Sequence, residues 1–334
     1  MKKYSIAIIG ATGAVGQQLI KWLHKKNFPF KTISVYASKK SVGKIIRYNQ
    51  YVYTIQELTT EIFKDKDICF FCTNEHVSSK FVPYALKEDC IVIDNSTFYR
   101  QFSDVPLLIP SINKRDYTNQ KLLANPNCAT SILCSALHPL TNLYAIKKVV
   151  VSTYQSVSGI GFQAMNELKV QTRSCLDGIK YKSLYFPNLK NKTKYQMAFN
   201  CLPQVGCLLD NNVSTEEIKM IQETKKIMKS DFKLIPTCVR VPTLSCHCES
   251  VYVEFEKKID LNLIIKEMKK QKEIKISNKL LPVNSNCANR EEVFISRIRQ
   301  IDEYSLAFYI VSDNLLKGAA TNAIDIAFLA IERD

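Results

Sequence analysis

Short apolar segments alternate with amphipathic segments through the first third of the chain. An apolar run at residues 4–9 predicts a strand, and the pattern at residues 17–24 predicts a helix. By the same criteria, strands are predicted at residues 32–36, 67–72 and 91–93 and a helix at residues 76–87. Because strands alternate with helices here, we predict an α/β fold with a parallel, doubly wound sheet.

The rest of the chain has longer β-rich segments with fewer helices between them. Strands are predicted at residues 148–154, 292–299 and 304–311 and on both sides of a proline-containing bend, with amphipathic helices at residues 216–228 and 261–270 and a closing helix. Residues 175–212 show neither the helical nor the strand spacing of apolar residues. We interpret them as an irregular excursion that serves as a lid or a subunit contact. At 334 residues, the chain is long enough for about two domains.

Three glycines follow the first predicted strand at a spacing that suits a dinucleotide. Gly10, Gly13 and Gly16 form a G-x-x-G-x-x-G motif between the strand and the helix. Glycines at this point let the backbone approach a pyrophosphate that sits on the helix N-terminus. The motif alone is a weak signal, and its position directly after the first strand strengthens it.

The end of the second predicted strand bears on the choice of cofactor. Enzymes that use NAD place an acidic residue there for the ribose hydroxyl. This chain instead has Ser38, Lys39, Lys40 and Ser41. Hydroxyl groups and cations suit a 2′-phosphate, which favours NADP. The alternative is a solvated basic turn without a ligand.

The segment from Ala124 to Cys134 predicts the position of a reactive thiol. Two asparagines and a proline indicate a turn, and small apolar residues follow, so Cys128 is predicted near the first turn of a helix. Unpaired amides and the positive end of the helix dipole favour a thiolate there and can receive an oxyanion. The alternative is a buried structural cysteine behind the turn.

Charge and cysteine content argue against several classes of protein. The formal net charge is +15, but the lysines are scattered without aromatic residues between them, so we predict no nucleic-acid partner. Twelve cysteines spread over a chain without an export signal are typical of reduced, cytoplasmic thiols. Asparagine, histidine and proline interrupt the uncharged span at residues 122–146, so we predict no membrane span.

Two cysteine patterns raise the question of a metal site. Cys69 and Cys72 point to opposite faces of one predicted strand, and we interpret both as core residues. Cys246, His247 and Cys248 are adjacent along another strand, so their side chains cannot all converge on one ion. We therefore predict no metal site.

Seven segments together resemble the aspartate-β-semialdehyde dehydrogenase family. They follow the family's order and spacing over nearly the whole chain, at residues 10–16, 95–100, 125–130, 153–161, 216–219, 240–247 and 313–320. The resemblance implies reduction of L-aspartyl-4-phosphate by NADPH to L-aspartate 4-semialdehyde and phosphate through a cysteine thioester. This reaction leads to lysine, methionine, threonine and isoleucine.

The family pattern also implies roles for individual residues. Cys128 is the nucleophile, His247 the general acid/base and Gln155 the residue that orients the acyl intermediate. The phosphate-binding positions fall on Arg100, Asn127 and Lys219, and the amino-acid-binding positions on Glu216 and Arg240. The cofactor-binding positions fall on Gly10, Thr12, Gly13, Ala14, Val15, Gly16, Ser38, Lys39, Ser41, Ser158, Gly159 and Asn314.

The implied fold is a Rossmann-like NADP-binding domain, residues 1–130 with a C-terminal helix at residues 314–334, and a mixed α/β catalytic and dimerisation domain at residues 131–313. A cytoplasmic homodimer, or a homotetramer built from it, is expected. Two alternatives stay open. One is N-acetyl-glutamyl-phosphate reductase, although an acetylated amine has no charge for Glu216 to bind. The other is an inactive NADP-binding paralogue, although the residues for catalysis are intact.

Overall fold

The computed structural model describes residues 2–277 and 280–332 of the chain. Its internal contacts divide the chain into unit 1, Met1–Asn127 with Ala319–Asp334, and unit 2, Cys128–Gly318. The breaks thus follow Asn127 and Gly318, and not residues 130 and 313. The first break precedes Cys128 because α4 (Cys128–Thr141) is one continuous helix that packs on the sheet of unit 2.

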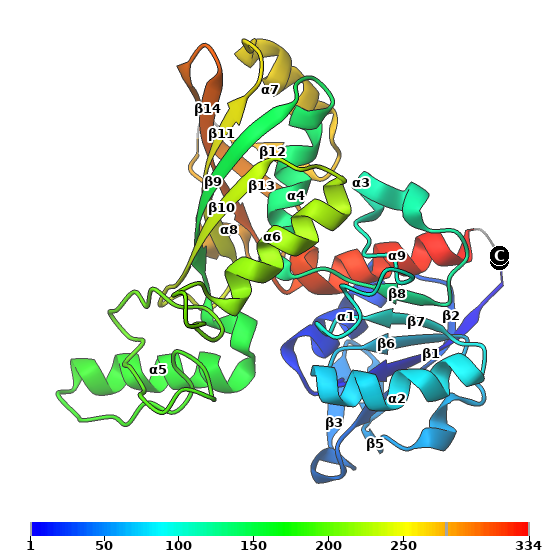
Figure 1. Cartoon of the computed structure of the whole chain (residues 1–334). Helices are drawn as coiled ribbons and strands as arrows, with labels where there is room; N and C mark the ends of the chain where they lie inside the picture. The colour runs from blue at the N-terminus through cyan, green and yellow to red at the C-terminus, as the bar shows by residue number, and fades with distance from the viewer. Residues whose placement is uncertain (1, 278–279, 333–334) are drawn as a thin grey trace. The chain divides into compact units, whose positions relative to one another are not determined.

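Unit 1 contains a six-stranded sheet in the order β5-β2-β1-β6-β7-β8, in which every pair is parallel. The strands are β1 (Tyr4–Ile9), β2 (Phe30–Ala37), β5 (Gln56–Glu57), β6 (Ile68–Phe71), β7 (Ile91–Asp94) and β8 (Leu122–Ala124), with a separate hairpin of β3 (Ile45–Tyr48) and β4 (Tyr51–Thr54). The helices are α1 (Ala14–Lys25), α2 (Glu75–Lys87), α3 (Pro110–Asn113) and α9 (Thr321–Ile331), with 3₁₀ turns η1 (Lys39–Ser41), η2 (Thr60–Phe63) and η3 (Lys114–Asp116). The elements can be followed in Figure 1.

The central strands of this sheet are apolar on both faces, which requires helices on both sides. All four residues of β6 and of β7 are buried. The C-terminal helix α9 packs against α1, where Lys26 Nζ lies 2.8 Å from Asp325 Oδ1 and the Phe28 and Phe328 rings are 4.8 Å apart. The predicted parallel α/β sheet is therefore confirmed.

Two details of unit 1 differ from the prediction. Strand β6 ends at Phe71, so Cys69 is buried in the core but Cys72 lies past the strand end and is partly exposed. The predicted helix at residues 314–334 begins instead with a π-helical turn, η5 (Leu316–Ala320), before α9. Residues 333–334 of that prediction lie outside the described residues.

Unit 2 contains a mixed six-stranded sheet in the order β10-β9-β11-β14-β13-β12. Its strands are β9 (Ile146–Gln155), β10 (Lys233–Arg240), β11 (His247–Phe255), β12 (Ile274–Ile276), β13 (Val293–Asp302) and β14 (Ser305–Ser312). Its other helices are α5 (Phe162–Leu176), α6 (Thr215–Met228), α7 (Leu261–Lys270) and α8 (Asn284–Cys287), with the 3₁₀ turn η4 (Val157–Ile160).

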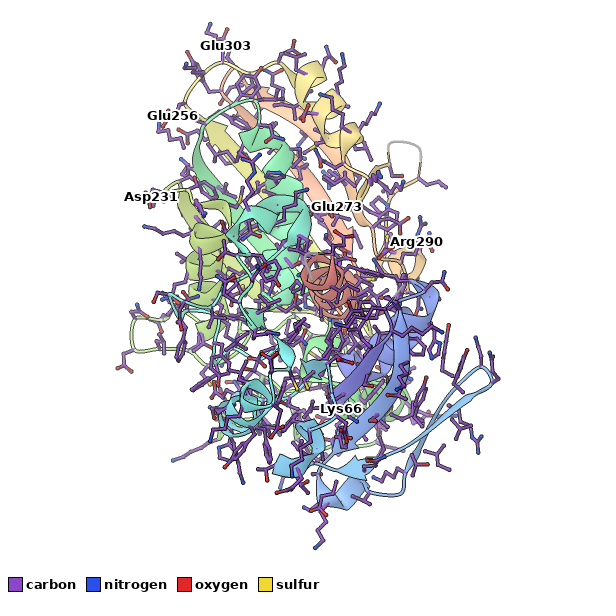
Figure 2. The ribbon with its side chains drawn as sticks, turned by 90° about the vertical axis from the view of Figure 1, so that its right-hand side faces the viewer. Lys66, Asp231, Glu256, Glu273, Arg290 and Glu303 are labelled. Atoms are coloured by element: carbon purple, nitrogen blue, oxygen red, sulfur yellow. The ribbon has the colours of Figure 1, made fainter. Side chains whose placement is uncertain are left out.

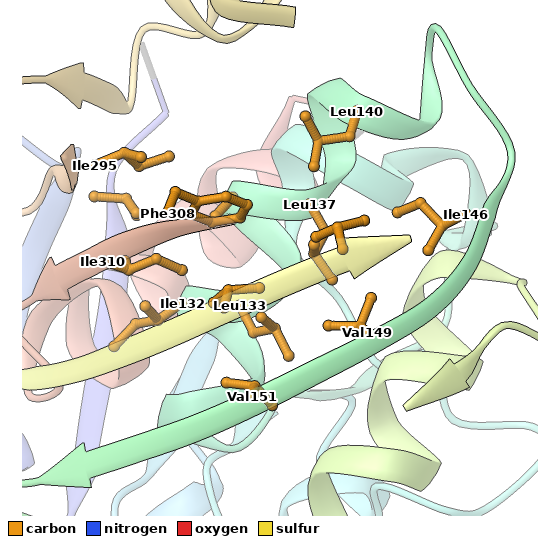
Figure 3. Close-up of a cluster of buried hydrophobic side chains, with 14 of the residues drawn as sticks. Ile132, Leu133, Leu137, Leu140, Ile146, Val149, Val151, Ile295, Phe308 and Ile310 are labelled. Atoms are coloured by element: carbon orange, nitrogen blue, oxygen red, sulfur yellow. The ribbon is translucent and has the colours of Figure 1, made fainter. Parts of the chain in front are cut away.

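Helices α4, α6 and α7 cover one face of this sheet (Figure 1). Leu133 and Leu137 of α4 are fully buried against Val149 and Val151 of β9 and against Phe308 of β14 (Figure 3). Alternate residues of each strand enter this core, as expected for a sheet with one helix-covered face. The core holds the N-terminus of α4 in a fixed position relative to the strand ends.

The excursion after α5 is irregular from Asp177 to Val213, as predicted, but α5 itself was missed. Buried Glu167 of α5 accepts hydrogen bonds from the Ser183 hydroxyl and the Leu184 amide, both at 2.9 Å. Gln171, one turn later, accepts from the Met197 amide at 2.7 Å. These hydrogen bonds to side chains of α5 hold the excursion in place, where it has no helix or strand to pair its backbone groups.

Charged side chains occupy the outer surface. Asp231, Glu256 and Glu303 project from unit 2 in Figure 2, and Glu303 pairs with Lys258 at 2.7 Å with both side chains well exposed. Among the residues that the structure describes, no helix combines the length and the apolar character that a membrane crossing requires.

One acidic side chain lies inside the core of unit 2. Glu249 of β11 is fully buried beside Thr153 of β9 and Ile310 of β14, and neither of its carboxyl oxygens has a hydrogen-bond partner within the described residues. Burial raises the pKa of the Glu249 carboxyl well above its usual range. The folded protein therefore favours the neutral carboxylic acid.

Replacing Glu249 by glutamine should make stability less dependent on pH. The unfolded chain ionises this carboxyl near pH ~4.3 and the folded chain only at higher pH, so the natural protein loses stability as the pH rises above about 4.3. We expect the free energy of unfolding of Glu249→Gln, measured in urea at pH 5 and pH 8, to increase relative to that of the natural protein by up to about 1.4 kcal/mol per pH unit. Glu303→Gln, at an exposed position, is the control. If the difference in free energy of unfolding between Glu249→Gln and the natural protein is the same at both pH values, Glu249 is not a buried neutral acid.

Candidate active site

Cys128 is the first residue of α4, as predicted, and a network of asparagines fixes the turn before it. The Asn125 amide donates to Asn95 Oδ1 at 2.8 Å and to the Ala319 carbonyl at 3.1 Å. The Asn322 amide of α9 donates to Asn125 Oδ1 at 2.6 Å. These bonds fix the turn within unit 1, and Cys128, as the first residue of α4, lies at the end of the helix where the backbone amides have no partner within the helix.

Gly318 in the π-helical turn approaches Cys128 closely, and it was missed as a site residue. A Cβ on Gly318 would lie 2.6 Å from the Cys128 Cβ, so only glycine fits. The same turn is fixed at Lys317, whose carbonyl accepts from the Ser131 hydroxyl at 3.0 Å and whose ammonium pairs with Glu273 at 2.6 Å. The glycine within Leu-Lys-Gly-Ala-Ala was the available sequence signal.

Strand pairing brings three predicted residues to one edge of the sheet in unit 2. Gln155 and Arg240 end the parallel strands β9 and β10 and are register partners. His247 begins β11, which runs antiparallel to β9. The His247 Nε2 atom lies 3.3 Å from the Cys128 Sγ atom, so the predicted nucleophile and histidine are in direct contact.

A buried set of charges lies beside this pair. Glu216, in the first turn of α6, accepts from the Gln155 amide at 3.0 Å and pairs with Lys219 at 3.4 Å. Arg240 is 5% exposed and donates from Nη1 to the Ser156 carbonyl at 2.7 Å. Two buried atoms, Arg240 Nε and Gln155 Oε1, have no hydrogen-bond partner within the described residues. Such unpaired polar atoms are expected where a polar ligand binds.

The loop after β9 contributes small polar residues. Ser158 and Ser156 both donate to Asn314 Oδ1, at 3.0 and 3.2 Å, so Asn314 joins this loop to the segment after β14. A Cβ on Gly159 would lie 3.2 Å from Arg240 Nη1 and 3.6 Å from the His247 ring. Glycine at this position therefore leaves room for the arginine and the histidine.

Burial and charge together determine the protonation of His247. Burial, and secondly the nearby Arg240 guanidinium, lower the pKa of His247 to about 3, while Glu216 acts in the opposite direction. The Ser156 amide donates to His247 Nδ1 at 3.2 Å. The imidazole is therefore neutral near pH 7.

The glycine turn of unit 1 fits the phosphates of a dinucleotide. Gly10 has φ +84° and its Cβ would meet the Cys72 carbonyl at 2.3 Å, while a Cβ on Gly16 would lie 2.5 Å from the Gly10 carbonyl. Gly13 is the N-cap of α1 and makes no side-chain cap, so the first amides of the helix are left for a ligand. The turn is therefore a cradle for an anion on a helix N-terminus.

The other predicted cofactor positions of unit 1 surround this cradle in the chain. Thr12 and Val15 are partly exposed, and Ala14 is buried. At the end of β2, Ser38 and Lys39 are exposed, and Ser41 closes the 3₁₀ turn η1.

The two predicted phosphate residues of unit 1 are buried. Arg100 is 6% exposed and donates from Nη2 to the Asn95 carbonyl at 2.8 Å. Asn127, the last residue before α4, is 7% exposed.

The described part of the chain contains neither a disulfide nor a cluster of side chains that could bind a metal ion. No disulfide joins any two of the twelve cysteines, all of which lie in the described part of the chain. No group of three or more histidine, cysteine or acidic residues among the described residues could hold a metal ion.

Comparison with known proteins agrees with this geometry. The family model for the semialdehyde dehydrogenase NAD binding domain matches residues 5–120, and the model for the semialdehyde dehydrogenase dimerisation domain matches residues 137–317. Unit 1 therefore binds a nicotinamide dinucleotide, and the dimerisation model indicates a homodimer.

Individual relatives resemble the chain over nearly its whole length. The aspartate-semialdehyde dehydrogenase of Bacillus subtilis is 39% identical over 331 residues, 96% of each chain, and that of Aquifex aeolicus is 38% identical over 341 residues, 98% of each chain. The crystal structure of aspartate semialdehyde dehydrogenase II from Vibrio cholerae, complexed with ASA, has a TM-score of 0.94 and 33% identity over 99% of both chains. The chain belongs to the aspartate-semialdehyde dehydrogenase family.

Proposed function

We propose that this chain reduces L-aspartyl-4-phosphate to L-aspartate 4-semialdehyde with NADPH, and that the acyl group is carried as a thioester on Cys128. The reaction itself follows from family membership, and the cofactor preference and the residue roles are the proposal. One observation carries it: the Cys128 sulfur lies at the N-terminus of α4, 3.3 Å from His247 Nε2.

The proposed chemistry needs an activated sulfur and a stabilised oxygen. Cys128 attacks the acyl carbon and phosphate leaves, which forms the thioester. When bound, the reduced nicotinamide supplies the hydride that converts the thioester into the aldehyde. The amides of α4 and the His247 ring stabilise the charge that develops on the substrate oxygen, and Gln155 orients the acyl group.

The substrate's amino-acid end suits the buried charges of unit 2. We assign the α-ammonium to Glu216 and the α-carboxylate to Arg240, whose planar fork can donate two parallel hydrogen bonds. Lys219 supplies a cation for the phosphate, and Arg100 and Asn127 of unit 1 are proposed for the same group. Holding both ends of the substrate fixes its reacting carbonyl.

Glu216 separates this proposal from the first alternative. N-acetyl-glutamyl-phosphate reductase acts on an acetylated amine, which carries no charge for a carboxylate, so Glu216 would contribute no ion pair to that substrate. The second alternative, an inactive paralogue, would have no reason to keep Cys128 and His247 in contact.

For the cofactor we propose NADP. The glycine cradle accepts the pyrophosphate of either dinucleotide, so the preference must come from the end of β2. Lys39 and Lys40 are exposed there, beside the Ser38 and Ser41 hydroxyls, where a 2′-phosphate can be contacted. Ser158, Gly159 and Asn314 of unit 2 are proposed as further contacts to the cofactor.

We also propose a cytoplasmic location and a homodimer that can assemble further into a homotetramer. Twelve cysteines without a disulfide between them in the described residues suit a reducing compartment. The sheet face of unit 2 that lacks α4, α6 and α7 carries half-exposed apolar residues such as Val150 and Ile235, 37% and 39% exposed, which suit a subunit contact.

Substrate discrimination tests the proposed function. With NADP and phosphate, the natural protein should oxidise L-aspartate semialdehyde and reject its N-acetylated analogue. Glu216→Gln keeps the shape but removes the charge, so kcat/KM for the free amino acid should fall about tenfold or more, which is about 1.4 kcal/mol per factor of ten. Asp231→Asn, at an exposed position in the same unit, is the control. A natural protein that prefers the N-acetylated aldehyde would assign the chain to the acetylglutamyl branch.

Cofactor preference is tested at the end of β2. The natural protein should have a higher kcat/KM with NADP than with NAD, and replacing Lys39 and Lys40 by alanine should raise KM for NADP several-fold with little change for NAD. The contact is equal in the ground and transition states, so the change should fall on KM and not on kcat. Lys31→Ala, at the other end of β2, is the control. Equal efficiency of the natural protein with both cofactors would refute the NADP assignment.

A further inference from the structure

The two nitrogens of the His247 ring have different partners. The Ser156 backbone amide lies 3.2 Å from Nδ1 with hydrogen-bond geometry, and the Cys128 sulfur lies 3.3 Å from Nε2. A backbone N–H can only donate, so Nδ1 must present a lone pair to it. The single proton of a neutral imidazole is then on Nε2, facing the sulfur.

We propose that Ser156 is a positioning residue that holds His247 as the neutral Nε2–H tautomer. In this form the ring donates a hydrogen bond to the Cys128 sulfur and to the substrate oxygen, and it does not store the thiol proton. The proposal rests on the proposed function of Cys128 and narrows the general acid/base role of His247 to that of a fixed donor.

The charges around the ring favour the same form. Arg240 of β10 donates to the Ser156 carbonyl at 2.7 Å, and the space left by Gly159 brings its guanidinium near the ring. A second proton, on Nδ1, would face the Ser156 N–H, and the positive charge it gives the ring would lie near the Arg240 guanidinium. Burial and Arg240 lower the pKa of His247 to about 3, while the Glu216 carboxylate of α6 and a backbone hydrogen bond with Cys246 act in the opposite direction.

The Ser156 hydroxyl offers the competing arrangement. It lies 3.3 Å from His247 Nδ1 and could accept a hydrogen bond from that nitrogen if Nδ1 carried the proton. The same hydroxyl lies 3.2 Å from Asn314 Oδ1 and 2.8 Å from Ser158 Oγ, and its single proton can serve only one of these contacts at a time. The amide has no such choice of role, because it is a donor in every protonation state. The amide therefore decides the tautomer.

With a fixed donor, the reaction balances without a proton leaving the ring. The Cys128 sulfur forms a bond to the acyl carbon, and the bond to the phosphate oxygen breaks with its electron pair. Cys128 reacts as the thiolate, and the departing phosphate takes from solvent the one proton that the reaction consumes. Hydride addition gives an oxyanion that accepts from Nε2–H. Its collapse restores the carbonyl and expels the Cys128 thiolate, which again accepts from Nε2–H.

Nitrogen NMR on the full-length protein tests the tautomer without reference to turnover. The chain has four histidines, so ¹⁵N-histidine labelling with His247→Gln identifies the His247 signals. We expect one protonated and one unprotonated nitrogen, with the proton on Nε2, unchanged from pH 5.5 to pH 8. A proton on Nδ1, or conversion to imidazolium within this range, would overturn the proposal. If Nε2–H is found in a protein that fails the substrate test, the proposed function falls and the tautomer assignment stands.

Two changes at residue 156 separate the amide from the hydroxyl. Ser156→Ala removes the hydroxyl and keeps the N–H, so the Nε2–H signature should persist. Incorporating lactic acid at the same position replaces the N–H by an ester oxygen and otherwise matches the alanine variant. The ester form should lose the pure Nε2–H signature and about tenfold or more in kcat relative to Ser156→Ala, with KM for the semialdehyde changed less. An ester form with the same signature and the same kcat would show that the Ser156 amide is not the determinant.

Discussion

The chemistry of unit 2 depends on the register between β9, β10 and β11. That register places Gln155 and Arg240 side by side at two carboxyl ends and His247 at the adjacent amino end. A shift of one residue in any of these strands would turn the side chain to the opposite face. The apolar core between α4 and the sheet fixes both the register and the position of Cys128, because the same helix supplies the core residues and the sulfur (Figure 3).

Much of this arrangement is readable from the sequence, because it follows from periodicity and turn chemistry. The apolar run before Gly10 and the Asn-Pro-Asn turn before Cys128 each predict an element and its end, and both occur as predicted. Glu216 was placed in the first turn of its helix, where Ser214 and Glu217 form a capping box. The resemblance to a family then assigned roles that local patterns cannot assign.

The rest could not be predicted because it depends on close approaches between distant segments. Helix α5 has a weak amphipathic pattern, and its buried Glu167 and Gln171 have partners in the excursion. The need for Gly318 arises only from the Cys128 Cβ that lies against it. The Ser156 amide has no side-chain signature at all, since every residue except proline carries the same N–H. Residues that act through their backbone are therefore the ones that sequence patterns miss.

The central claim is that the acyl group is carried on Cys128, and intact-peptide mass spectrometry tests it most directly. The protein is incubated with L-aspartate semialdehyde and NADP in the absence of phosphate, so that a thioester formed by hydride removal is not displaced, and the reaction is stopped with acid. We predict the added mass of one aspartyl group on the peptide that contains Cys128, none on the peptide that contains the exposed Cys201, and loss of the adduct when phosphate is added before the acid. An adduct on another cysteine, or turnover with no acylated cysteine at any time, would contradict the account.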